Sequence, residues 1–338
     1  MRALQVDEYG AAPRIADIPV PEPRRGELRV RIAACGLNFA DLLMMKGEYQ
    51  ERPPLPLTPG MELSGTVEAA GPDTDGLPPG TRVAVFAGHG GLAERGCFPA
   101  ERCVPIPDSM SFRDAAAFLV AYGTSHVALA HKAGLQPGET LLVLGAAGGV
   151  GLTAVELGKR MGARVIASAR GADKLDVARR AGADVLIDSA TADLRGELKA
   201  LGGADVVYDP VGGAQFEAAL RCVRPEGRVL VIGFASGDVP QIPANLLLVK
   251  NISVIGHYWG GYLAFRPDVI TQSLSELMQW FACGDLLPHV SHVLPLERAG
   301  EALELLRERR STGKVVVSIG DEAAESGQGP HRDATDAE

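Results

Sequence analysis

The sequence predicts an α/β fold with a doubly wound, six-stranded parallel sheet, preceded by a second, β-rich region. The first observation is a strict alternation of strand-like and helix-like runs over residues 140–259. The second is that most of these strand-like runs are apolar throughout, as expected for parallel strands covered by helices on both faces. The third is the glycine cluster "GAAGGVG", which lies between the first strand and the first helix of the series. Six such strands form the doubly wound dinucleotide-binding arrangement, the Rossmann fold.

The elements follow one another in a readable order. Up to residue 110, strand patterns such as "ELRVRIAACG" and "GTRVAVFAG" are interrupted by glycine and proline, and residues 51–60 form a proline-rich loop. A helical, alanine-rich stretch begins at Ser111. The strands of the alternating series are then expected at 140–145, 164–169, 184–189, 205–212, 227–234 and 253–259. The helices between them are expected at 150–162, 172–182, 192–202, 214–223 and 243–251. Two more helices, a strand at 313–320 and an acidic, disordered tail over 320–338 complete the chain.

The composition limits the function classes. Of the 338 residues, 46% are hydrophobic and 22% are charged, which is ample for large buried cores. The net charge of −9 argues against nucleic acid or an anionic membrane surface as the main partner. There is no apolar run of transmembrane length and no signal-peptide pattern. The five cysteines lack any CxxC pair, which is typical of reduced thiols in a cytoplasmic protein.

The glycine cluster predicts a phosphate cradle. Gly145, Gly148 and Gly151 recur every three residues, with Gly149 inserted. Glycine lets the strand turn sharply into the helix and lets the backbone approach a pyrophosphate, which then faces the amides of the first helical turn. We therefore expect Gly148, Gly149 and Val150 to contact a dinucleotide.

The end of the second strand predicts which dinucleotide is bound. An enzyme that prefers NAD usually has an acidic residue there, whereas this strand ends in Ser168 and Ala169 and is followed by Arg170 and Lys174. A hydroxyl and two cations suit a 2′-phosphate, so we expect NADPH to be the cofactor, held by Ser168, Arg170 and Lys174. The alternative is that both cations are solvated residues at the start of a helix.

Five motifs give the chain a family resemblance: "CGLNFADLLMMKGEY", "PLTPGMELSGTVEAAG", "PGETLLVLGAAGGVG", "DVVYDPVGG" and "VIGFASG". It resembles the zinc-independent medium-chain dehydrogenase/reductases, in the NADPH:quinone oxidoreductase branch related to zeta-crystallin. The resemblance implies a GroES-like substrate domain at 1–117, a Rossmann domain at 118–258 and a return to the substrate domain at 259–319. It also implies a homodimer and an active site in the cleft between the domains. Vesicle-membrane homologues share the "LNFADL…PGME" sequence pattern, which leaves a non-catalytic function open.

The resemblance also implies that no catalytic metal is present. Zinc-using relatives place a cysteine, a histidine and a third ligand where this chain has Asn38, Met61 and Val120 or a neighbour. An amide, a thioether and an alkyl side chain cannot form the site of nitrogen and sulfur ligands that zinc requires.

The remaining site residues are also implied by the resemblance. Asn38 is expected beside the nicotinamide and Tyr49 in the substrate cleft, although each could instead be structural, as a turn residue and as a loop anchor. A tyrosine that relatives often have at position 43 is replaced by Leu43. Further cofactor contacts are expected from residues at a helix start, at strand ends and near the terminus: Thr124, Val211, Gly233, Phe234, Ala235, Tyr258, Trp259 and Arg309. Tyr258 and Trp259 could equally anchor the domain hinge, and Arg309 lies in a run of basic residues.

The sequence therefore predicts a metal-free, NADPH-dependent oxidoreductase that transfers hydride to a quinone or an activated enone. The quinone is favoured because its product anion is delocalised and requires little help from the protein. The alternatives are an enoyl or alkenal double-bond reductase, and a nucleotide-binding scaffold protein with little turnover.

Overall fold

The computed structural model describes residues 1–320 and divides the chain into two compact units. Within the described residues, the first unit contains residues 1–117, 292–309 and 315–320, and the second contains residues 118–291 and 310–314. Apart from its first residue, the tail expected to be disordered lies outside the described residues.

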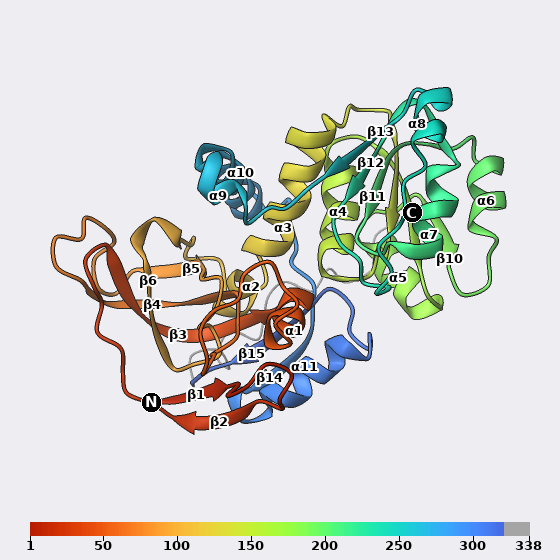
Figure 1. Ribbon diagram of the computed structural model, residues 1–338. Coiled ribbons are helices and arrows are strands. Elements are labelled where there is room, and N and C mark those ends of the chain that lie inside the picture. Colours follow the sequence, from red (N-terminus) through yellow and green to blue (C-terminus); the bar gives the residue numbers. More distant parts are fainter. Residues whose placement is uncertain (321–338) are drawn as a thin grey trace, which may run out of the picture. The chain divides into compact units, whose positions relative to one another are not determined.

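The second unit confirms the predicted parallel sheet (Figure 1). The neighbouring strands of this sheet are all parallel, and their spatial order is β10-β9-β8-β11-β12-β13. The strands are β8 (Thr140–Leu144), β9 (Arg164–Ala169), β10 (Val185–Asp188), β11 (Ala204–Asp209), β12 (Val223–Val231) and β13 (Ser253–Gly256). The helices that connect them are α4 (Gly149–Arg160), α5 (Ala172–Arg180), α6 (Leu194–Ala200), α7 (Gly213–Leu220) and α8 (Ala244–Lys250).

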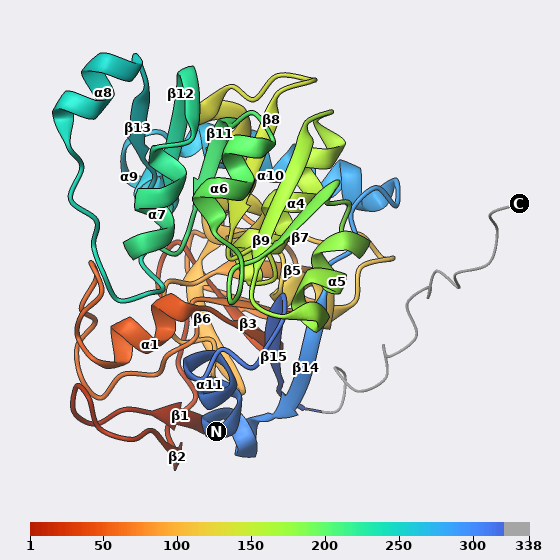
Figure 2. The same cartoon turned by 90° about the vertical axis from the view of Figure 1, so that its right-hand side faces the viewer.

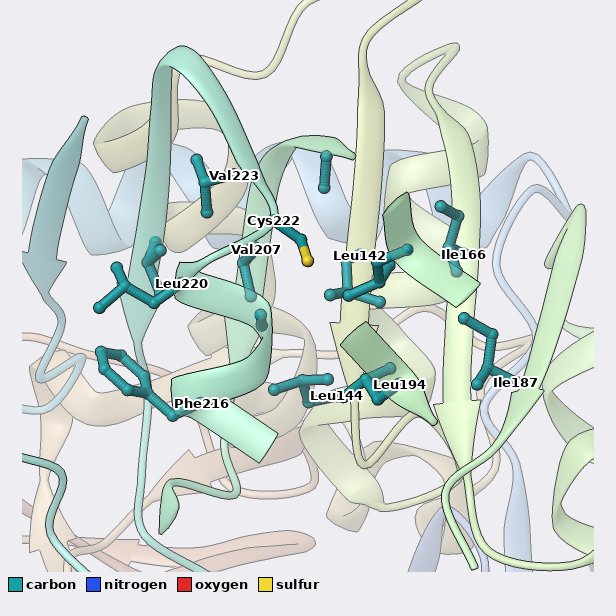
Figure 3. Close-up of a cluster of buried hydrophobic side chains, with 14 of the residues drawn as sticks. Leu142, Leu144, Ile166, Ile187, Leu194, Val207, Phe216, Leu220, Cys222 and Val223 are labelled. Atoms are coloured by element: carbon teal, nitrogen blue, oxygen red, sulfur yellow. The ribbon is translucent and has the colours of Figure 1, made fainter. Parts of the chain in front are cut away.

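Apolar side chains on alternate positions of the central strands cover both faces of this sheet. On one face, Leu142 and Leu144 belong to a buried cluster with side chains of α6 and α7 (Figure 3). On the other face, Leu141 packs so closely against Gly158 of α4 that a Cβ on that glycine would overlap it. Successive side chains of a strand point to opposite faces, so a fully apolar strand is what a sheet between two helix layers requires.

A helical pair extends the second unit beyond its expected end. Helices α9 (Tyr262–Phe265) and α10 (Pro267–Ala282) belong to this unit, which corrects the expected return to the first unit at residue 259. The cause is packing against α3 (Leu119–His126) and its continuation in π-helical geometry, Val127–Ala133. His126 of α3 pairs with Ser273 of α10 at 2.8 Å, and its ring lies edge-on to Trp280. The sequence pattern predicts the helix but not its partner.

The first unit is β-rich, as expected. Its main sheet has seven strands in the order β14-β15-β3-β4-β5-β7, with β6 on β3, and the pairs from β15 to β7, including β3 with β6, are antiparallel. The strands are β3 (Glu27–Leu37), β4 (Glu62–Ala70), β5 (Arg82–Phe86), β6 (Arg95–Pro99), β7 (Cys103–Pro105), β14 (Val290–Pro295) and β15 (Lys314–Ser318). A two-stranded sheet, β1 (Arg2–Gln5) with β2 (Arg14–Asp17), lies beside them (Figure 2). The helices are α1 (Phe39–Met45), α2 (Phe112–Ala116) and α11 (Ala299–Arg307), with 3-10 turns at Ala100–Arg102 and Leu296–Arg298.

Candidate functional site

The glycine turn after β8 is too tight for side chains. Gly145 has a φ of +57°, a left-handed conformation that favours glycine, and its carbonyl accepts a hydrogen bond from Gly148 N at 2.9 Å. A Cβ on Gly151 would overlap the same carbonyl oxygen. Helix α4 begins at Gly149, directly after the turn, so its first backbone amides point out of the end of the sheet where β8 stops. This is the geometry of an anion cradle.

The end of β9 has no carboxylate and two cations beyond it. Ser168 is fully buried, and its hydroxyl has no hydrogen-bond partner within residues 1–320. Arg170 is exposed and Lys174 is half-buried. Asp188, at the end of the neighbouring strand β10, accepts hydrogen bonds from Gly171 N and Ala190 N, which lower its pKa. That carboxylate therefore orders the loop.

The loops after β11 and β12 close on the glycine turn. Asp209 is buried and accepts hydrogen bonds from Val211 N at 2.7 Å and Gly212 N at 2.9 Å, which fixes the loop after β11. Desolvation of this carboxyl group raises its pKa, against the effect of the two amides. Val211 packs against Gly145, and its carbonyl accepts from Ser236 N at 2.9 Å.

The second of these loops carries three more predicted residues. Ala235 N donates to Pro210 O at 3.0 Å, so the loop that contains Gly233, Phe234 and Ala235 is tied directly to the loop after β11. The structure thus brings these residues together with Val211 at the carboxyl ends of the strands, where ligands of such sheets bind.

The returning segment 310–314 also reaches the glycine turn, which sequence reasoning missed. Gly313 N donates to Ala147 O at 2.8 Å, and Gly313 bridges Gly148. Lys314 is 5% exposed, and its Cδ would lie 3.3 Å from a Cβ on Gly149. A buried cation beside a helix N-terminus suits an anionic ligand there. The only signal in the sequence was a basic residue in a motif, "STGK", far from the cluster.

The end of β13 contacts α3, where Thr124 lies. His257 Nε2 lies 3.1 Å from Thr124 O, and burial lowers the pKa of His257 to about 4, so the ring is neutral and Nε2 is the donor. Trp259 is buried and its indole covers Gly123, which supports an anchoring role for this side chain. Tyr258 is 41% exposed and covers its own neighbours, Gly260 and Gly261.

In the first unit, Asn38 is held between two buried carboxyl groups. It is the N-cap of α1, and its amide Nδ2 donates to Glu62 at 3.0 Å. Asp41 accepts from Asn38 N at 2.8 Å and from the backbone N–H groups of Gly60 and Met61. Glu62 is 1% exposed and Asp41 is fully buried. Glu62 and Asp41 were not among the residues predicted for the site.

Tyr49 and Arg309 also belong to the first unit. Tyr49 is half-buried in the loop after α1, which Tyr9 anchors through a hydrogen bond to Pro53 O. Arg309 is exposed and follows the end of α11 with a φ of +56°. The other predicted cofactor residues lie in the second unit.

Residues 1–320 contain no group of three or more histidine, cysteine, aspartate or glutamate side chains arranged to hold a metal ion. No helix among them is long and apolar enough to cross a membrane. The five cysteines, all of which lie in this range, form no disulfide.

Two family models match the chain. Residues 24–108 match the "Alcohol dehydrogenase GroES-like domain", which confirms the expected class of the first unit. Residues 149–282 match the "Zinc-binding dehydrogenase" model, a segment that includes neither Asn38 nor Met61. The structure of the quinone oxidoreductase from Thermus thermophilus, described also in complex with NADPH, is 34% identical with a TM-score of 0.83. That comparison covers 94% of this chain and 100% of the other.

Curated relatives cover the chain equally well. The quinone oxidoreductase-like protein 2 homolog of Nematostella vectensis is 40% identical over 94% of this chain and 88% of its own length. The human synaptic vesicle membrane protein VAT-1 homolog is 33% identical over 89% of this chain and 81% of its own length. On this evidence the chain belongs to the medium-chain dehydrogenase/reductase family of oxidoreductases, among its quinone oxidoreductase-like members.

Proposed function

We propose that this protein is an NADPH-dependent oxidoreductase that reduces quinones without a metal ion. The observation that carries the proposal is the end of β9, where two cations and no carboxylate follow a strand next to the glycine-rich turn that begins α4. A relative of known structure is described in complex with NADPH, which agrees with this choice of cofactor.

The residues of the second unit fit such a dinucleotide. The backbone N–H groups of Gly148, Gly149 and Val150 would hold the pyrophosphate together with Lys314, because α4 begins here and the Lys314 side chain lies against Gly149. Arg170 and Lys174 would bind the 2′-phosphate of the cofactor, and the Ser168 hydroxyl would also contact it. Thr124, Val211, the loop 233–235 and the aromatic pair at 258–259 are proposed to contact the rest of the cofactor. Arg309 remains a proposed phosphate contact.

The proposed chemistry needs little from the protein. The reduced nicotinamide supplies a hydride when it is bound. Asn38 and Tyr49 are the proposed catalytic residues, and neither of them is a Lewis acid. An acceptor whose product anion is delocalised, such as a quinone, therefore suits the site better than a simple ketone, whose alkoxide is localised. The expected location of this activity is the cytoplasm, in keeping with cysteines that form no disulfide.

A second candidate function is a nucleotide-binding scaffold with little turnover, which the likeness to the VAT-1 homolog favours. An alkenal or enoyl reductase is the alternative within the enzymes. Acceptor classes separate all three, because a scaffold would bind NADPH and reduce nothing, whereas a double-bond reductase would turn over enones faster than quinones.

The test is to compare a small benzoquinone and an enone on the wild type and on Tyr49→Phe. An enolate needs a hydrogen-bond donor more than a hydroquinone anion does, so kcat/KM should fall further for the enone, by up to roughly a hundredfold. Tyr9→Phe is the matched control, because Tyr9 anchors the same loop through Pro53. An equal loss on both acceptors in Tyr49→Phe would contradict the donor role and indicate that Tyr49 only anchors the loop.

The protein is also proposed to form a homodimer through the edge of the parallel sheet. Strand β13 is the last strand of that sheet, and α8, which precedes it, has no buried residue. Large apolar side chains are exposed along this stretch: Val239 at 63%, Leu248 at 77% and Val249 at 69%. An unpaired strand edge beside an apolar surface favours pairing with a second copy.

A further inference from the structure

The Asn38 amide has a definite orientation in the first unit. Its Nδ2 lies 3.0 Å from Glu62 Oε1 and 3.4 Å from Gly36 O. A carbonyl oxygen and a carboxylate oxygen accept hydrogen bonds, so the group that faces them must be the amide NH2 and not the amide oxygen. Both N–H bonds of Asn38 are therefore directed at the protein.

Glu62 is built into the fold at the point where it meets Asn38. It is the first residue of β4 and is 1% exposed. The two residues before it, Gly60 and Met61, donate their backbone N–H groups to Asp41, whose other oxygen accepts from Asn38 N. The start of β4 and the start of α1 are thus joined through the Asp41 carboxylate, which accepts all three of these hydrogen bonds. Glu62 therefore has little freedom to move away from Asn38.

We propose that Glu62 is a positioning residue that turns the NH2 of Asn38 inward and leaves Asn38 to act as a hydrogen-bond acceptor through Oδ1. This inference rests on the proposed function, because the ligand group would be a hydroxyl or an amide N–H of the bound dinucleotide. An amide oxygen has two lone pairs, so it can accept from a ligand while it also caps a helix. Asn38 then does not donate to the anion that develops on the acceptor, and that task falls to Tyr49.

The assignment is tested by exchanging the donor at position 38 and the acceptor at position 62. Asn38→Asp is nearly isosteric and keeps an N-cap side chain, but it places a third carboxyl group beside Glu62 and Asp41. Two facing carboxylates repel each other, so this variant should lose stability as the pH rises and both of them become ionised. In the double variant Asn38→Asp/Glu62→Gln, the new amide at 62 can donate to the new carboxylate at 38. Glu62→Gln alone keeps an acceptor for Asn38 and is the matched control.

The readouts are the free energy of unfolding in urea and the Kd for NADPH, measured for all four proteins, followed by kcat/KM with a benzoquinone. We expect the double variant to regain most of the stability that Asn38→Asp loses at the higher pH. We also expect it to regain about tenfold in NADPH affinity and in kcat/KM, since the amide at position 62 again holds the acceptor oxygen at position 38 in place.

Two results would overturn the proposal. If the double variant does not regain stability, Glu62 does not hold the amide. If it regains stability but stays about a hundredfold to a thousandfold below the wild type in kcat/KM, Asn38 is a donor to the developing anion. A wild type that reduces no acceptor would refute the proposed function alone, and the unfolding and NADPH measurements would still decide the role of Glu62.

Discussion

At the scale of single residues, the two cations after β9 decide which dinucleotide is preferred. Each charge-assisted hydrogen bond to a 2′-phosphate is worth about 1.4 kcal/mol or more, which is about tenfold in affinity. Arg170→Ala and Lys174→Ala should therefore each raise the Kd for NADPH about tenfold and leave the Kd for NADH unchanged. Both constants can be measured by quenching of protein fluorescence.

Lys314→Met is the matched control for this prediction. Lys314 lies beside the glycine turn and not beside β9, and methionine keeps the buried stem of the side chain. Because the pyrophosphate is common to both dinucleotides, this variant should weaken NADPH and NADH by the same factor. A wild type that is indifferent to the 2′-phosphate, or a loss of NADH affinity in Arg170→Ala, would contradict the assignment of the two cations.

Short sequence patterns could predict the site residues that are positioned by the strand or turn in which they lie. The turn at 145–151 and the carboxylate-free end of β9 follow from a strand, a glycine spacing and a helix start, all within about thirty residues. Contacts between distant segments were not predictable in this way. Lys314 reaches Gly149, Trp259 covers Gly123 and Glu62 meets Asn38 through tertiary packing, which no periodicity encodes.

At the scale of elements, Glu156 links α4, α3 and the segment that follows α10. Its carboxyl group accepts from the Tyr122 hydroxyl at 2.5 Å and from Leu287 N at 2.8 Å, and burial raises its pKa to about 7. The folded state therefore holds this proton more tightly than the unfolded chain, where the pKa is about 4.5. The contribution of Glu156 to stability is full below pH 4.5 and is lost as the pH rises toward 7.

The raised pKa of Glu156 predicts that the stability of the wild type and that of Glu156→Gln depend differently on pH. Burial lowers the pKa of His126 and of His257, which titrate in the same pH range with the opposite effect on stability, so the comparison must be with Glu156→Gln. The free energy of unfolding of the wild type, relative to that variant, should fall between about pH 4.5 and pH 7. Tyr122→Phe removes a hydrogen-bond donor to the Glu156 carboxylate, so the fall in the free energy of unfolding should be larger. A difference that does not change with pH would show that Glu156 ionises normally.

At the scale of the whole molecule, the parallel sheet was predictable strand by strand, because most of its strands are short apolar runs between helices. The point at which the second unit ends was not predictable from the sequence. Helix α10 has an ordinary amphipathic pattern, and only its contacts with His126 and Phe118 of the α3 region assign it to this unit.

The apolar edge formed by α8 and β13 predicts the oligomeric state. Leu248 is 77% exposed, so Leu248→Glu should not disturb the core, but it would place a charge in the proposed dimer interface. Light scattering should show a dimer for the wild type and a monomer for this variant. Val20→Glu, at an exposed apolar position of the first unit, is the control and should remain dimeric. A wild type that is monomeric at micromolar concentration would exclude this interface.

Hydride transfer from NADPH to a quinone without a metal ion can be measured by steady-state kinetics of the purified protein. We expect kcat/KM for a small benzoquinone to be higher with NADPH than with NADH, by about a hundredfold if each cation contributes about tenfold. The rate should be unchanged by a chelator, and a simple ketone should not be reduced. Robust ketone reduction, activity lost together with stoichiometric zinc, or NADPH binding without turnover of any acceptor would contradict the account.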